Sequence, residues 1–335
     1  MLKKRVKHTL SVSGAAAADG WNRAKSVGWF PALEDFCFRA HVLPDTVTGA
    51  QAPLKQRQLS FAVDNHIFAS LLSSSPLLHK ARLLSVSAPG ASAWLGVIPS
   101  PSLNQVFDSR QFTALVRWWL GLPVYARVSA CPTCGVAMDL FGYHALTCRT
   151  RGSLGVRHNA LREVFLHFCN TAGIRAERES PGLLPDSADR PADVLLPSQV
   201  HIPNYLPDSA TCLDFAVTHP QQPTTIDRAG EETAAAATLY ESKVKLPRYE
   251  SECLANKLNF IPMVVEAFGA WGEKSEPVFK FVSRAAALCH SADEDKTLGY
   301  VRAAMSVVLQ RHNANMLVKH RDPESPVVDG PVPDY

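Results

Sequence analysis

Apolar positions in the first half of the chain recur at helical spacing. Residues 60–84 place large apolar side chains three or four positions apart, and residues 73–76, Ser-Ser-Ser-Pro, interrupt the pattern. A second stripe follows Asp108, a typical N-cap residue, and ends near Leu120 before a glycine. A third stripe at residues 157–172 predicts a longer amphipathic helix. This half is therefore predicted to be mainly helical.

Beyond residue 173, short apolar runs replace the helical stripes. Residues 192–196 and 211–218 are bounded by Pro, Asp and Ser, which predicts buried strands. Residues 259–266 form a third run, in which Pro262 indicates an edge strand or a bulge. Because strands and helices are mixed here, we expect an α+β fold. Helices are predicted at residues 226–245, 273–291 and 294–318.

The composition allows about two ordinary domains with a substantial core. Of the 335 residues, 46% are hydrophobic and 19% charged, which excludes wholesale disorder. No run approaches the roughly 20 apolar residues of a membrane-spanning helix. The basic N-terminus lacks a hydrophobic signal core, so we expect a nuclear or cytoplasmic protein that is not secreted. The eight cysteines are then expected to be reduced rather than paired in disulfides.

Three of the cysteines crowd together with a histidine. Cys131, Cys134, His144 and Cys148 have the spacing C-x2-C-x9-H-x3-C. The first pair belongs on a tight turn and the second on successive helical turns, which brings four ligands around one ion. The spacing predicts a structural zinc site. A catalytic zinc is disfavoured because four protein ligands leave no open position.

Two aspartates and a lysine-bearing helix form a second candidate site. Asp193 lies at the start of one predicted strand and Asp214 in the middle of the next, so both carboxylates can approach one Mg²⁺. The residues after the second strand predict a helix on which Lys245 and Tyr249 share a face, provided that it continues through a proline. Lys243 is turned away from Lys245, so only one of them can face the sheet. Such a site suits phosphodiester hydrolysis.

From about residue 81 to 273 the sequence resembles the C-terminal region of non-LTR retrotransposon polyproteins that encode a restriction-like endonuclease. The order is the same: a CCHC zinc knuckle, a helix with Arg-His-Asn, and a nuclease of the PD-(D/E)xK type. The matching segments are the four cysteine and histidine ligands, Arg157-His158-Asn159, Arg190-Pro-Ala-Asp193, Leu213-Asp-Phe-Ala216, Arg248-Tyr249 and Phe260-Ile-Pro-Met-Val-Val-Glu266.

The resemblance implies a restriction-endonuclease-like core: a small mixed sheet flanked by helices, preceded by a mainly helical region and the zinc knuckle. It implies Asp193 and Asp214 as magnesium ligands, Lys245 or its substitute Lys243 beside water or phosphate, and Tyr249 or Glu266 in support. Three departures from the pattern are Ala192 within the Pro–Asp pair, Ala216 in place of a lysine, and Arg248. The segments are an irregular leader (1–59), a helical thumb- or linker-like region (60–125), the knuckle (126–156), the endonuclease (157–292), a C-terminal helix (293–320) and a disordered tail (321–335).

The chain contains no two adjacent aspartates, so the Y/F-x-D-D signature of a reverse-transcriptase palm is absent. We therefore expect no polymerase activity, and a reverse transcriptase, if one is needed, would be a separate partner. On the resemblance, the chain would be an isolated endonuclease module or a fragment of a longer polyprotein.

The net charge of +3 hides a basic region. From Arg110 to Arg175 there are eight arginines, no lysine and only two acids, a local net charge of +6. Arginine suits bidentate phosphate contacts, which favours DNA, or alternatively RNA, as partner. The predicted nucleic-acid contacts are Arg127, Arg149, Arg151, Arg157, His158 and Arg162, with a structural role at the helix start as the other interpretation of His158.

Three functions remain open from the sequence. The first is a Mg²⁺-dependent endonuclease that nicks target DNA, with structural Zn²⁺ in the knuckle. The second is a zinc-containing nucleic-acid-binding module whose nuclease has decayed. The third is a protein-interaction module without activity.

Overall fold

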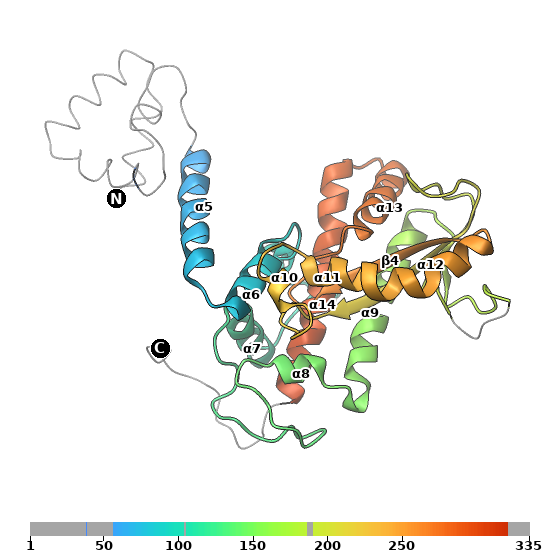
Figure 1. Ribbon diagram of the computed structural model, residues 1–335. Coiled ribbons are helices and arrows are strands. Elements are labelled where there is room, and N and C mark those ends of the chain that lie inside the picture. Colours follow the sequence, from blue (N-terminus) through green and yellow to red (C-terminus); the bar gives the residue numbers. More distant parts are fainter. Residues whose placement is uncertain (1–37, 39–55, 104, 186–189, 321–335) are drawn as a thin grey trace, which may run out of the picture. The chain divides into compact units, whose positions relative to one another are not determined.

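The computed structural model describes residue 38 and residues 56–103, 105–185 and 190–320 (Figure 1). The predicted tail and nearly all of the predicted leader lie outside these residues. The chain divides into two compact units, Met1–Pro76 and Leu77–Tyr335. The described helix of the first unit is α5 (Gln56–Ser74), and Pro76 separates it in sequence from α6 (Leu77–Ser87), as the interrupted pattern predicts. All further elements belong to the second unit.

A four-stranded mixed sheet lies at the centre of the second unit, in the order β1-β2-β3-β4. β1 (Glu177–Arg178), β2 (Val194–Leu196) and β3 (Thr211–Thr218) are successively antiparallel. β4 (Asn259–Glu266) returns parallel to β3 after a helical crossover. The fold is therefore α+β, as predicted.

Different helices cover the two faces of the sheet. Leu213 and Phe215 of β3 face a core formed with α9 (Ser153–Thr171), α13 (Ser275–His290) and α14 (Glu294–Lys319). Because side chains alternate along a strand, Cys212 faces the other side and packs against α12 (Leu246–Ala255). Asp214 shares the face of Cys212, so it lies on the side of the sheet that α12 covers.

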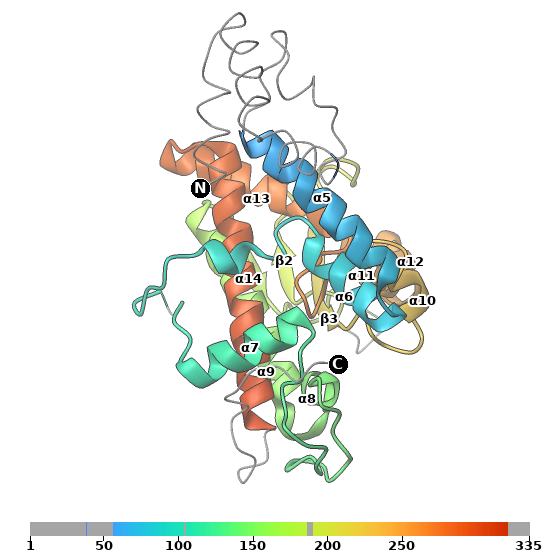
Figure 2. The ribbon, with the colours of Figure 1, turned by 90° about the vertical axis from the view of Figure 1, so that its left-hand side faces the viewer.

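A second apolar core surrounds the cysteine and histidine ligands. It contains Trp94 of the short helix η1 (Ala93–Gly96), Trp118 and Trp119 of α7 (Ser109–Leu120), Phe268 after β4, and Leu317 of α14. The Trp118 and Phe268 rings stack with centroids 4.0 Å apart. Helix α14 contributes to both cores, and Figure 2 shows it running lengthwise beside the sheet. The segments predicted to begin at 126, 157 and 293 thus belong to one compact unit.

Two of the three predicted strands, β3 and β4, have the predicted bounds, and β4 lies at an edge of the sheet, as Pro262 indicated. The prediction of one helix over residues 226–245 was wrong. The segment forms α10 (Ile226–Ala229), a turn in which Ala234 has a positive φ of 59°, α11 (Ala235–Tyr240) and a π-helical turn, Glu241–Lys245. Among the described helices, none is both long and apolar enough to span a membrane.

Candidate functional sites

The two predicted aspartates meet where β2 begins beside the middle of β3. The pairing of Val194 with Leu213 is extended by one residue, because the Asp193 amide donates to the Leu213 carbonyl over 2.9 Å. The Asp193 carboxylate turns back and accepts the Phe215 amide at 2.7 Å. Asp214 lies between these two β3 residues, so Asp193 is hydrogen-bonded to the backbone on either side of it, and the two carboxyl groups are close enough to affect each other's pKa. The sheet register therefore creates the carboxylate pair.

Lys245 completes this constellation from the helix above the sheet. Its Nζ lies 2.6 Å from Oδ2 of Asp214, and both side chains are largely buried. Lys245 ends the π-helical turn, in which the Leu246 amide bonds to the Glu241 carbonyl five residues back. Pro247 follows without an N–H to donate, so the wider turn lets the helix continue into α12. Lys243 is exposed and Lys245 faces the sheet, which agrees with the first choice made from the sequence.

The pKa values of the two carboxyl groups are shifted in opposite directions by burial, hydrogen bonds and neighbouring charges. Burial raises the pKa of Asp214 to about 6, and the nearby Asp193 charge adds to this effect, against the opposing charge of Lys245. For Asp193, burial also acts to raise the pKa, but hydrogen bonds from His158 and the Phe215 amide outweigh it and lower the pKa. Two buried carboxylates side by side favour a bound cation. The pair therefore fits a divalent metal, and Lys245 supplies one positive charge.

His158 belongs to this site rather than to a separate phosphate contact. It lies in the second turn of α9, and its Nε2 is 3.1 Å from Oδ1 of Asp193. Oδ1 and Oδ2 of Asp193 are thus both engaged, by His158 and by Phe215, which fixes the plane of the carboxylate. The Arg-His-Asn segment indicates His158 as a candidate, but nothing in the sequence indicates its partner.

Tyr249 and Glu266 lie outside this constellation. Tyr249 packs in the core beneath α12, with its ring 5.3 Å from that of Phe260 and the Arg248 guanidinium 4.9 Å from it. Glu266 pairs with Thr218, four residues along β3 from Asp214, a separation of about 13 Å at the usual rise per residue. Its Oε1 accepts the amides of Ala236 and Ala237 instead. Glu266 therefore holds the start of α11.

The four predicted zinc ligands lie together. The ligand atoms of Cys131, Cys134, His144 and Cys148 all lie within 4.8 Å of one another. A tetrahedral zinc with Zn–S bonds of about 2.3 Å needs sulfur atoms about 3.8 Å apart. The set therefore fits zinc with four protein ligands and little adjustment. It is the one group of three or more such side chains close enough for a metal among the residues that the structure describes.

Local hydrogen bonds shape the two halves of this zinc module. In the first half, Gly135 has a φ of 76°, and its amide bonds to the Cys131 carbonyl at 2.9 Å, which closes the turn between the two cysteines. In the second half, the Asp139 carboxylate accepts the amides of Phe141, Tyr143 and His144 and so fixes the start of α8 (Tyr143–Thr147). Hydrogen bonds from Thr133 overcome the effect of burial and lower the pKa of Cys131 to about 6, which favours a thiolate ligand.

Two of the arginines predicted to contact nucleic acid are buried, and that prediction was wrong for them. Arg157 donates to Oδ1 of Asn313 at 2.7 Å and to the Leu146 carbonyl at 3.3 Å. Arg162 is paired with Glu163 and Glu179. Charged residues at helical spacing look exposed in a sequence, but these two guanidinium groups join elements within the unit.

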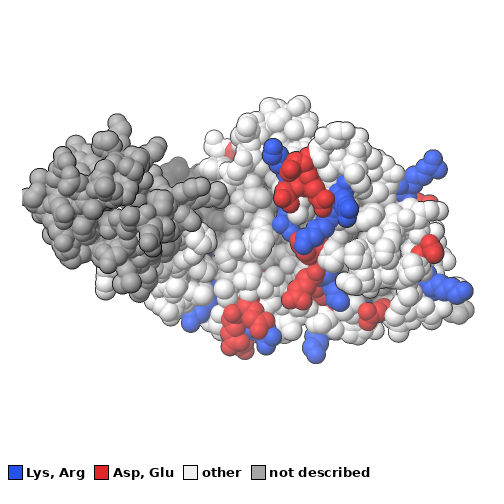
Figure 3. All heavy atoms as spheres, turned by 90° about the horizontal axis from the view of Figure 1, so that it is seen from above, with Lys and Arg blue, Asp and Glu red and all other residues white. Residues whose placement is uncertain are grey.

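Arg127 and Arg149 are exposed and flank the zinc module, as predicted, whereas the side chain of Arg151 lies outside the described part. Trp118 and Trp119 are buried in the core around the zinc ligands, so their rings pack there and are not available to stack on bases. The face viewed from above in Figure 3 carries acidic and basic side chains next to one another, without one continuous basic surface. Of the arginines predicted to contact phosphate, Arg127 and Arg149 are thus the ones found exposed in the described part of the chain.

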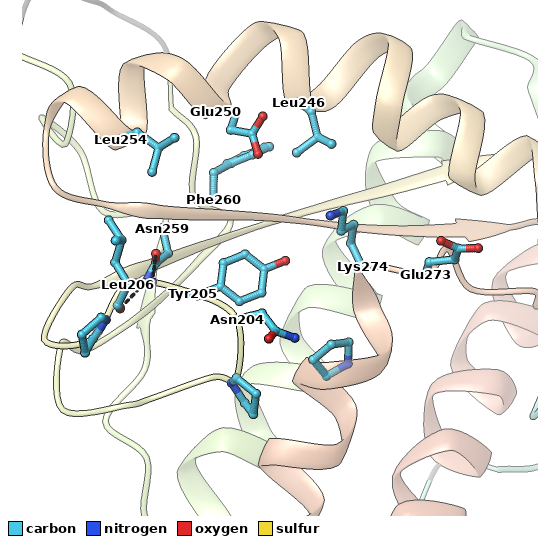
Figure 4. Close-up of a pocket in the computed structure, with 13 residues that line it drawn as sticks. Asn204, Tyr205, Leu206, Leu246, Glu250, Leu254, Asn259, Phe260, Glu273 and Lys274 are labelled. Carbon is cyan, nitrogen blue, oxygen red and sulfur yellow. Dashed lines mark hydrogen bonds between the residues drawn. The ribbon is translucent and has the colours of Figure 1, made fainter.

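A cavity of about 610 Å³ lies between α12 and the loop that carries Tyr205 (Figure 4). Leu246, Glu250 and Leu254 line it at intervals of one helical turn, opposite Tyr205 and Lys274. Burial, with the charges of Glu241 and Glu250, raises the pKa of Tyr205 to about 12. Two carboxylates, of Glu250 and Glu273, face a single lysine, so the charge of this cavity does not suit a phosphate chain.

Glu241 is a buried carboxyl group that the sequence did not single out as functional. It is 2% exposed, and burial raises its pKa to about 8. A Cβ on Gly272 would clash with its carboxyl group, so a larger residue there would force the Glu241 side chain to move.

Comparisons with known proteins do not identify a family. No family model matches this chain, and no curated protein matches it.

Proposed function

We propose that this chain is a metal-dependent DNA endonuclease whose active site consists of Asp193, Asp214 and Lys245. The observation that carries the proposal is their convergence: Asp193 is hydrogen-bonded to the backbone on either side of Asp214, and the Lys245 ammonium lies 2.6 Å from the Asp214 carboxylate. These residues come from three separate elements. All three were selected from the sequence for phosphodiester hydrolysis.

The arrangement of the core supports the same proposal. The resemblance implies one helix, a small central sheet and a covering helix. Here α9 lies on one face of a mixed sheet, and the α11–α12 segment covers the other (Figure 1). The lysine missing at Ala216 is replaced in space by Lys245, because the π-helical turn directs its side chain onto Asp214.

Each residue has a distinct task in the proposed reaction. Asp193 and Asp214 would hold Mg²⁺, which supplies a water of lowered pKa and neutralises charge on the phosphate. Lys245 lies where its ammonium can orient the attacking water or the scissile phosphate. His158 and the Phe215 amide keep the Asp193 carboxylate in one plane, so it binds with little loss of entropy.

The zinc module would bind the DNA backbone through its exposed arginines. Arg127 and Arg149 flank its ligands and are exposed. Both lie on a module that zinc would rigidify. Arg157 and Arg162 are excluded from this role by their burial. We propose nuclear localisation as the setting that gives access to DNA.

The test is nicking of supercoiled plasmid in Mg²⁺ by the full chain and by two variants. Asp214→Asn should abolish nicking, because the isosteric amide cannot supply a charged ligand. Asp208→Asn is the matched control, since Asp208 is exposed in the loop before β3, and it should nick like wild type. Equal nicking by wild type and Asp214→Asn would reject the assigned site. DNA binding without nicking by wild type would favour the decayed binding module instead.

A further inference from the structure

Two consecutive residues of α9 connect the zinc module with the aspartate pair. Arg157 donates to the carbonyl of Leu146, which lies between the zinc ligands His144 and Cys148. His158, the next residue, contacts Asp193. One turn of helix thus contacts both candidate metal centres.

Burial of the charged Arg157 guanidinium costs desolvation free energy, so its contacts call for an explanation. Arg157 is 4% exposed, and its hydrogen bonds go to a carbonyl and to the Asn313 amide oxygen rather than to a carboxylate. Burial lowers its pKa to about 10. An apolar side chain of similar size often fills such a position at no loss of stability. We therefore explain the buried Arg157 by the two groups that it joins: the Leu146 carbonyl in the ligand-bearing helix α8 and Asn313 of α14.

The chain between the two centres is short and ordered. Four residues separate Cys148 from the first residue of α9, Ser153, and the helix η2 (Thr150–Gly152) occupies most of them. Lys319 of α14 donates to the Ser153 hydroxyl at 3.0 Å, which ties the start of α9 to α14. A shift of α8 would therefore act on α9 at its start and at Arg157, and His158 would move with them.

We propose that Arg157 and His158 are positioning residues through which the zinc module orients Asp193. Zinc occupancy then sets the affinity of the Asp193–Asp214 pair for its divalent metal. This inference rests on the proposed function, because it assumes that the aspartate pair binds a metal. Outer contacts to metal ligands typically change metal affinity 10- to 100-fold when removed. We expect a loss of that size on removal of either zinc or the Arg157 donors.

The test measures Mn²⁺ affinity by electron paramagnetic resonance, which does not depend on cleavage. Mn²⁺ prefers oxygen ligands and does not compete well for the thiolates. Zinc-loaded protein is compared with protein stripped of zinc and desalted, and with the Cys134→Ser variant. Both zinc-deficient forms should bind Mn²⁺ 10- to 100-fold more weakly.

Variants that keep all four zinc ligands separate this coupling from loss of the module. Arg157→Met should retain zinc and weaken Mn²⁺ binding 10-fold or more, and Arg157→Lys should recover part of the loss by restoring a donor. His158→Gln, which keeps a side-chain amide near Asp193, should lose less than His158→Ala. His167→Gln, at an exposed position of the same helix, is the control and should bind like wild type.

The outcomes distinguish the two proposals. If wild type binds Mn²⁺ through Asp214, and neither zinc removal nor any Arg157 or His158 variant changes the affinity by more than twofold, the coupling is rejected and the nuclease site stands. If wild type binds no Mn²⁺, or Asp214→Asn binds it equally, the proposed function is rejected together with the coupling. Should Arg157→Met fail to fold, the His158 variants decide.

Discussion

The Lys245 ammonium lies 2.6 Å from Oδ2 of Asp214 and neutralises part of the charge of the carboxylate pair. On the proposed function, the lysine that would orient water or phosphate is here the counter-ion of the aspartates. A bound metal and this ammonium would share the same carboxylate, and their charges oppose one another.

Replacement of Lys245 should therefore separate metal binding from cleavage. We expect Lys245→Met to reduce nicking at least about 100-fold, as loss of a positioned catalytic group typically does. Its Mn²⁺ affinity should stay equal or rise, because a competing positive charge is gone. Lys243→Met is the control on the exposed side of the same turn. Loss of nicking with Lys243→Met but not with Lys245→Met would reverse the assignment.

The exposed arginines beside the zinc module should determine the salt dependence of DNA binding. Removal of one phosphate contact lowers the slope of log affinity against log salt by about 1. Arg149→Ala should show this reduction in a titration of duplex DNA. Arg228→Ala removes an exposed arginine of α10 that pairs with Glu232, and it should leave the slope unchanged. An unchanged slope for Arg149→Ala, and likewise for Arg127→Ala, would place the DNA elsewhere.

The buried Glu241 should make the protein less stable as the pH rises. Its pKa in the folded protein, about 8, exceeds its ordinary value of 4.5, so the folded state holds this proton more tightly than the unfolded state. The contribution of Glu241 to stability is then greatest below pH 4.5, decreases between pH 4.5 and 8, and is constant above. Glu241→Gln should raise the Tm more at pH 8 than at pH 5.

The matched control for this pH effect is Glu250→Gln, an exposed position on the same helical segment. Its Tm difference from wild type should be the same at both pH values. If Glu241→Gln behaved in that way too, the carboxyl group would not be held in its protonated form.

The stacking of Trp118 on Phe268 should be a main support of the second core. Trp118 is 3% exposed, and a Trp→Ala change in a core typically costs about 3–5 kcal/mol. We expect a loss of this order for Trp118→Ala in urea unfolding of the zinc-loaded protein. Leu120→Ala changes a half-exposed position of the same helix and should cost less than about 1 kcal/mol. Equal costs would indicate that this core contributes little.

The sequence predicts β3, β4 and the clustering of the four zinc ligands, since these depend on local pattern, but it does not predict the two-residue strand β1. The apolar run at residues 211–218 is bounded by turn-forming residues, and β3 has the same bounds. The zinc spacing needs only one turn and one short helix. The helix expected at 226–245 fails because its interruption at Ala234 and its π-helical turn depend on how the segment packs across the sheet.

Only part of the candidate active site can be predicted from the sequence. The aspartates and Lys245 follow from strand positions and helix spacing, but the contact of His158 with Asp193 joins residues 35 positions apart. The contact of Arg157 is still harder to predict, because its partner Asn313 lies 156 positions away in the sequence. An arginine in an amphipathic helix gives no local sign that such a partner will bury it.

The sheet has two edges, and neither offers a template for another chain. β1 is two residues long. At the other edge every residue of β4 is buried, Asn259 exchanges hydrogen bonds with the Leu206 backbone, and Pro262 has no N–H. Exposed and continuous edge strands promote edge-to-edge aggregation. A mixed sheet with one short edge and one covered edge should therefore resist strand addition and keep the protein monodisperse at the high concentrations used for metal titrations.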